Sequence, residues 1–96
     1  MTSKERAYLK SLASNIEPSF QVGKSSLTPE VTAAIAEAFN TKEIVKIAVL
    51  KNCFDDPKEI ASMVAERTHS QVVQVIGKKI VLYREGKKEK KKIILP

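Results

Sequence analysis

Three helix-start signals divide the chain and constrain its fold more than any other feature. Thr2 and Glu5 have the spacing of a capping box, in which each side chain accepts a hydrogen bond from the other residue's amide. Thr28 and Asp56 are capping residues that are each followed by proline, which is favoured at the first helical position. The sequence therefore predicts three helices, one after each signal.

Apolar residues recur at helical spacing after each signal. The predicted stripes are Tyr8, Leu9, Leu12 and Ile16; Val31, Ala34, Ile35, Ala38 and Phe39; and Ile60, Met63 and Val64. This spacing places each stripe on one face of its helix, where it packs on a core. Pro18 ends the first predicted helix, because the residue before a proline avoids the helical conformation.

The segments between the helices have the patterns of β-strands. Phe20 and Val22 alternate with polar residues, and Glu43–Leu50 is apolar on nearly both faces, which predicts a central strand. Gln71–Ile76 and Lys79–Tyr83 flank a tight Gly77-Lys78 turn. The order α-β-α-β-α-β-β predicts an α/β (α+β) two-layer sandwich with a four-stranded mixed sheet. We expect one domain over residues 1–84 and a basic tail over residues 85–96.

The excess positive charge lies at the C-terminal end. The net charge is +6, from 17 Lys+Arg and 11 Asp+Glu. Residues 78–96 hold Lys78, Lys79, Arg84, Lys87, Lys88, Lys90, Lys91 and Lys92 against Glu85 and Glu89, so the rest of the chain is balanced. This asymmetry predicts a polyanionic partner, nucleic acid first and an anionic membrane surface second. A merely solubilising role for these charges stays open.

The sequence offers no catalytic constellation. His69 and Cys53 are the single histidine and cysteine, so one chain can form neither a disulfide nor a zinc site of the usual ligands. Gly23-Lys24-Ser25 ends like a P-loop, but Pro18 stands where that motif requires glycine. We therefore expect a protein that is not an enzyme and has no metal, cofactor or small-molecule substrate.

No apolar run is long enough to span a membrane, and no signal-peptide segment follows the N-terminal charges. Together with the lone cysteine, these features predict a cytoplasmic protein.

A short polar loop, Gly23-Lys24-Ser25-Ser26, lies between the first strand and the helix that starts at Thr28. Its amides and those of the helix start can face an anion, Lys24 adds a positive charge, and the two serines add hydroxyl donors. The alternative is an ordinary strand-to-helix connection, and the loop taken alone favours that alternative.

Four segments of the chain match one family in consistent order. They are residues 4–13 (KERAYLKSLA), 18–24 (PSFQVGK), 27–31 (LTPEV) and 74–84 (QVIGKKIVLYR). They resemble the opening helix, the first strand with the entry to a GxxG loop, the second helix and the closing hairpin of YhbY-like proteins. The same module forms the CRM domain of plant organelle splicing factors.

The resemblance implies a fold like the C-terminal domain of translation initiation factor three and association with precursors of the large ribosomal subunit. The family's GxxG loop is compared with that of KH domains, which clamps the nucleic-acid backbone. By position, residues 23–26 would take this role. Ser26 stands where the family usually has glycine, so either its hydroxyl bonds phosphate directly or the loop grips RNA less tightly.

We therefore expect a monomer that binds RNA, with ribosomal RNA of the large-subunit precursor and ribosomal particles as partners. The predicted RNA-binding residues, on one continuous surface, are Gly23, Lys24, Ser25, Ser26, Thr28, Arg6, Lys10, Lys78, Lys79 and Arg84. The lysines of residues 87–92 would add long-range attraction. There are three Phe, two Tyr and no Trp, most of them on core stripes, with Tyr8 expected in the core and Tyr83 left open. Recognition of shape and phosphate more than base sequence follows.

Two alternatives remain from the sequence. The first is a protein-interaction module on ribosomal or assembly-factor proteins, with a tail that only solubilises. The second is a peripheral membrane protein, for which the chain lacks an apolar insertion patch and a lipidation signal.

Overall fold

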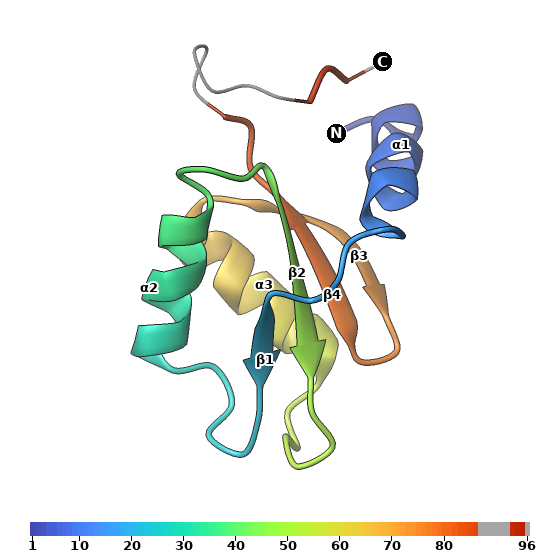
Figure 1. Cartoon of the computed structure of the whole chain (residues 1–96). Helices are drawn as coiled ribbons and strands as arrows, with labels where there is room; N and C mark the ends of the chain where they lie inside the picture. The colour runs from blue at the N-terminus through green and yellow to red at the C-terminus, as the bar shows by residue number, and fades with distance from the viewer. Residues whose placement is uncertain (87–92, 96) are drawn as a thin grey trace.

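The computed structural model describes residues 1–86 and 93–95, which form seven elements (Figure 1). They are α1 (Ser3–Ala13), β1 (Phe20–Val22), α2 (Pro29–Ala38), β2 (Ile44–Val49), α3 (Pro57–Thr68), β3 (Gln71–Ile76) and β4 (Lys79–Tyr83). The predicted element order is confirmed. In this part of the chain, no helix is both long and apolar enough to cross a membrane.

Each helix begins at its predicted cap. The Thr2 hydroxyl accepts from the Glu5 amide at 3.1 Å, and the Glu5 carboxylate accepts from the Thr2 amide at 2.8 Å. The Thr28 hydroxyl accepts from the amide three residues on at 3.2 Å, and the Asp56 carboxylate from the amide two residues on at 2.9 Å. Because the first amides of a helix have no partner within it, these side chains define where each helix starts.

The sheet has the strand order β1-β2-β4-β3. β1 and β2 are parallel, with Phe20 opposite Ile47, whereas β4 pairs antiparallel with both β2 and β3. β2 therefore has a neighbour on each side, as its apolar sequence predicts, and the sheet is mixed. The parallel pair also means that β1 and β2 end at the same edge of the sheet.

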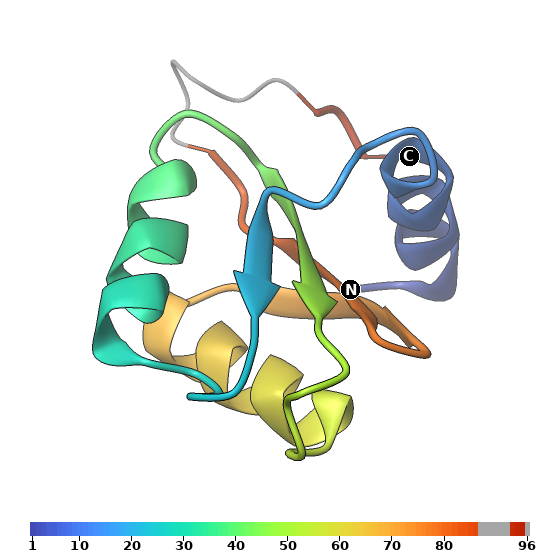
Figure 2. The same cartoon turned by 60° about the horizontal axis from the view of Figure 1, so that its bottom comes forward.

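Helices lie on both faces of the sheet (Figure 2). α2 and α3 cover one face through a core of Val22, Ile35, Phe39, Val45, Ile47, Val49, Cys53, Ile60, Ala61, Val64, Ala65, Ile80 and Leu82. α1 packs on the other face, and the buried residues there are Leu9, Ala13, Ile44, Val73, Val81 and Tyr83. The predicted two layers are thus the sheet with α2 and α3, and α1 is an additional helix on the opposite face.

The width of the predicted apolar stripes was overestimated. Leu9 and Ala13, four residues apart, make the buried contact of α1, so the neighbouring Tyr8 lies on its flank and is 40% exposed. The prediction that Tyr8 belongs to the core is wrong. Ala34 and Met63 are exposed for the same reason, because only the centre of a stripe faces a sheet. Tyr83, left open by the sequence, is buried.

Glu43 holds the described part of the C-terminal segment. Its buried carboxylate accepts from the amides of Gly86 at 2.9 Å and Ile93 at 2.7 Å. Ile93 and Leu95 then pack against the α1 side of the sheet. The predicted tail lysines (Lys87, Lys88, Lys90, Lys91 and Lys92) lie outside the described residues, and the domain boundary at residue 84 stays a prediction.

Candidate nucleic-acid interface

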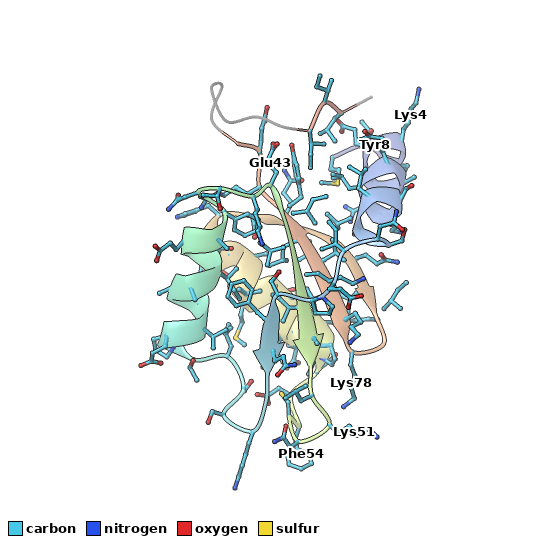
Figure 3. All side chains as sticks on the ribbon, viewed as in Figure 1. Lys4, Tyr8, Glu43, Lys51, Phe54 and Lys78 are labelled. Carbon is cyan, nitrogen blue, oxygen red and sulfur yellow. The ribbon has the colours of Figure 1, made fainter. Side chains whose placement is uncertain are left out.

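Three connections gather at one end of the sheet: Gly23–Ser26 after β1, Leu50–Asp55 after β2, and the Gly77–Lys78 turn between β3 and β4 (Figure 1). We call these residues the loop surface. They meet because parallel β1 and β2 end at the same edge, where antiparallel β4 begins. Glu43 lies at the opposite end (Figure 3).

Main-chain hydrogen bonds hold the three connections together. The Leu50 amide donates to the Val22 oxygen at 2.8 Å, which joins the ends of β1 and β2. The Val49 amide donates to the Lys78 oxygen at 2.7 Å, which joins β2 to the hairpin turn. The loop surface is therefore an extension of the sheet ladder.

The Gly23–Ser26 segment is a closed turn. The Ser26 amide donates to the Gly23 oxygen at 2.9 Å, and Ser26 has a φ of 57°, in the left-handed region that favours glycine. Ser26 thus adopts a positive φ, the conformation for which glycine would be expected at this position. At Gly23, a β-carbon would lie 3.4 Å from the Asn52 side-chain oxygen, so the two loops approach closely where a glycine stands.

Three exposed lysines, one from each connection, surround this end of the molecule: Lys24, Lys51 and Lys78. Within residues 1–86 and 93–95, none of their ammonium groups has an ion-pair partner. The acid within the loop surface is Asp55. Asp56 follows it with its carboxylate engaged at the α3 cap, and Glu30 lies in the first turn of α2. Figure 3 shows Lys51, Phe54 and Lys78 together at this end.

Lys10 and Lys79 line a second feature, a groove between the end of α1 and the sheet. Its cavity volume is about 360 Å³, and it is also lined by Ala13, Ser14, Lys46, Gln74, Ile76 and Val81. The Lys46 ammonium donates to the Ala13 oxygen at 3.2 Å, where a cation stabilises the carbonyl end of α1. Because Lys79 follows Lys78, the groove adjoins the loop surface.

Arg6 does not join these cations. Its guanidinium donates to the oxygens of Val72 at 2.7 Å and Val73 at 2.9 Å, beside the irregularity that interrupts the β3–β4 register. A β-bulge leaves main-chain groups without a ladder partner. Arg6 occupies these oxygens and ties α1 to β3, which gives it a structural role that the sequence did not indicate.

Arg84 lies at the far end of β4, away from the loop surface. Its guanidinium donates to the Thr68 oxygen at 3.1 Å and to the Asn40 side-chain oxygen at 3.4 Å, and stands 5.2 Å from the Phe39 ring centre. The prediction of one continuous surface is therefore wrong for Arg84, because β4 separates it from Lys78. Thr28 stays beside the loop, with its hydroxyl oxygen engaged by the α2 cap.

Sequence reasoning missed Lys51, Asn52 and Phe54. Phe54 is the most exposed of the five aromatic residues, at 94%. A signal was present, since this segment follows the strand expected to run parallel to the first one. Loops that leave the same edge of a sheet are neighbours, so residues 50–55 belong beside residues 23–26.

This end of the molecule combines exposed lysines with main-chain turns. Across the described ranges, no group of three or more His, Cys, Asp or Glu residues is placed to hold a metal ion. The lysines and the closed turn lie at the same end of the sheet as the start of α2, where Pro29 has no amide hydrogen, the Val31 amide is bonded to Thr28 and Glu30 adds a negative charge.

A model of the "CRS1 / YhbY (CRM) domain" matches residues 1–84. The chain is 42% identical over its whole length to "Probable RNA-binding protein YqeI" of Bacillus subtilis, covering 99% of that protein. It is 33% identical, again over its whole length and 95% of the relative, to an "RNA-binding protein" of Haemophilus influenzae.

Among solved structures, the fold matches the solution structure of the hypothetical protein SAV1595 from Staphylococcus aureus. The TM-score is 0.83 at 47% sequence identity, and the match covers 100% of this chain and 99% of the other. The element order and the mixed sheet are thus shared with an experimentally determined relative.

Proposed function

Starting from the premise that this chain belongs to the CRS1 / YhbY (CRM) domain family, we propose that it binds RNA through the loop surface. In this proposal the Gly23–Ser26 turn and the start of α2 bind a phosphate of the RNA backbone. Lys24, Lys51 and Lys78 neutralise neighbouring phosphates. The names of the relatives and the positive charge of this end both support RNA as the partner.

The observation that carries the proposal is that three exposed lysines from three separate connections lie at the same end of the sheet as the closed turn, and none has an ion-pair partner among residues 1–86 and 93–95. A cation that serves only the fold is usually paired with a carboxylate or a carbonyl, as Arg6 and Arg84 are. Lysines without such partners have no intramolecular contact to give up when they bind a ligand. A backbone-led interface follows, in which affinity depends on phosphate contacts.

The proposed RNA is ribosomal RNA in precursors of the large ribosomal subunit, and the proposed activity is assistance in their assembly in the cytoplasm. This finer statement rests on the family resemblance rather than on the geometry. A small backbone-binding module without a catalytic group suits such a role, because it stabilises one RNA conformation while assembly proceeds.

A filter-binding titration of Lys24→Ala tests the proposal. The variant should bind RNA more weakly, and the slope of log K against log salt should become shallower by about 0.7 to 1, the value for one lost phosphate contact. Its melting temperature should not change, because Lys24 is exposed and unpaired. For about five contacts, the wild-type slope should be roughly −3.5 to −4.5.

Lys4→Ala is the matched control, since it removes the same charge from the exposed start of α1, away from Lys51 and Lys78 (Figure 3). It should leave RNA affinity nearly unchanged. Salt-independent binding by the wild type, or equal effects of the two variants, would remove the support for the loop surface.

Crosslinking the protein to RNA in cells and sequencing the attached fragments tests the ribosomal target. Fragments should come from large-subunit precursor RNA. Co-sedimentation with ribosomal particles that survives digestion of exposed RNA would favour protein contacts instead.

A further inference from the structure

Phe54 is an exposed aromatic side chain for which the fold has no use. It is 94% exposed, whereas Phe39 and Tyr83 are almost fully buried. A phenylalanine side chain in water forgoes the stabilisation that burial would supply. Its ring is therefore fully available to a ligand.

The neighbouring residues hold Phe54 outward. Cys53 is 4% exposed and belongs to the main core, and its amide donates to the Leu50 oxygen at 3.0 Å in a turn. Two residues further on, Asp56 caps α3. Phe54 is thus presented between two anchored positions, which lowers the entropy that a ligand would lose on binding it.

The loop that carries Phe54 lies against the phosphate-binding turn. Asn52 of this loop stands beside Gly23, and Lys51 and Lys78 lie at the same end of the molecule as Phe54 (Figure 3). An aromatic ring next to a row of unpaired lysines is the arrangement that binds single-stranded nucleic acid, in which bases stack while phosphates meet cations.

We infer that Phe54 stacks on an unpaired RNA base, so that the loop surface selects single-stranded RNA over duplex RNA. This inference rests on the proposed function. A base inside a duplex is already stacked on its neighbours and cannot lie flat on a protein ring without being flipped out. The choice between the two forms of RNA then depends on one side chain.

The charges around Phe54 agree with a base as its contact. Asp55 and Asp56 adjoin it in the chain and repel phosphates and anionic headgroups, whereas the face of a base is uncharged. The phosphates would therefore lie on the side of Lys24, Lys51 and Lys78. In this arrangement the base lies over Phe54, and the RNA backbone lies over the Gly23–Ser26 turn.

The test compares three probes: an unstructured oligoribonucleotide of about ten nucleotides, an abasic ribose-phosphate chain of the same length, and a duplex. Phe54→Ala should weaken binding of the unstructured probe by about tenfold. Binding of the abasic chain and the duplex should change by less than about twofold, because their phosphates remain recognised. The salt slope should be unchanged.

Two further variants sharpen the test. Phe54→Trp introduces the only tryptophan of the chain, and its fluorescence should be quenched by the unstructured probe and not by the abasic one. Met63→Ala shortens another partly exposed apolar side chain, on α3, and should leave binding of all probes unchanged.

The inference would be overturned if Phe54→Ala lost the same affinity for the unstructured probe as for the abasic one. It would also be overturned if the variant bound both probes as tightly as the wild type does. It would also be overturned if Phe54→Ala kept its RNA binding but no longer floated with anionic vesicles or no longer formed a protein complex. If Lys24→Ala weakens RNA binding and Phe54→Ala does not, the proposed function stands and only the stacking role fails. If the wild-type protein binds no RNA, the proposed function itself fails.

Discussion

The amide of Ser26 donates to the oxygen of Gly23 at 2.9 Å, and Ser26 closes this turn with a φ of 57°. A serine therefore occupies a backbone conformation that costs a residue with a β-carbon of order 1 kcal/mol. The turn is closed without a glycine at position 26. This strained residue lies within the proposed phosphate site.

Ser26→Gly should stabilise the protein and leave RNA affinity within about twofold. We expect the free energy of unfolding to rise by about 0.5–1 kcal/mol, less than the strain removed, because glycine also gains freedom in the unfolded chain. Ser26→Val should lower it by about 1–2 kcal/mol. Urea titrations measure both, and a strong loss of RNA binding by Ser26→Gly would instead assign the serine hydroxyl to a phosphate.

Arg6→Ala should destabilise the fold. It removes the donor to the Val72 and Val73 oxygens, and a lost hydrogen bond to a charged group costs about 1.5–3 kcal/mol. Lys10→Ala, which removes a charge from the exposed side of the same helix, should change stability by less than about 0.5 kcal/mol. Urea unfolding compares the two, and weakened RNA binding by a fully stable Arg6→Ala protein would contradict the structural role.

Arg84→Ala should lower stability more than RNA affinity. The variant loses the bond to Thr68 and the contact with the Phe39 ring, together worth about 1–3 kcal/mol. Arg84→Ala and Lys24→Ala each remove one positive charge, so a difference between their RNA affinities reports the position of the charge and not the net charge. Filter binding well below the melting temperature should show the larger loss for Lys24→Ala.

Glu43→Ala should release the described C-terminal residues. The amides of Gly86 and Ile93 lose their acceptor, so their hydrogen exchange should accelerate, while amides within β2 remain protected. Glu37→Ala, which changes an exposed acid on α2, is the control and should leave both amides as slow as in the wild type. Unchanged exchange at Gly86 in Glu43→Ala would contradict the anchoring role.

The start of α1 should weaken in acid. The Thr2 amide, and after it the Thr2 hydroxyl, holds the pKa of Glu5 below its ordinary value of 4.5. A carboxylate with a lowered pKa in the folded state stabilises above its unfolded pKa, and this contribution is lost as the pH falls through the folded value. An NMR titration should place the Glu5 pKa below 4.5, and Glu5→Gln should remove the loss of protection of the Thr2 amide at low pH, measured as a protection factor that corrects for the intrinsic pH dependence of exchange.

The sequence predicted much of the candidate site, but not which cations share it. Residues 23–26 and Lys78 could be placed at one surface from their loops and from the family resemblance. Arg6 and Arg84 could not be separated from them, because an arginine's sequence neighbours do not reveal which distant carbonyl it will bind. Arg6 finds its acceptors 66 and 67 residues away.

What the amino-acid order alone decided is the set of elements, since caps, proline positions and alternation act between residues only a few places apart. Thr2, Thr28 and Asp56 start their helices in the structure as their neighbours require. Only the packed sheet decided that Asn52 lies beside Gly23 and that Tyr8 is exposed. Both outcomes depend on which strand edges and helix faces meet. Those contacts join residues that are far apart in the chain, so the local sequence around one of them does not indicate the other.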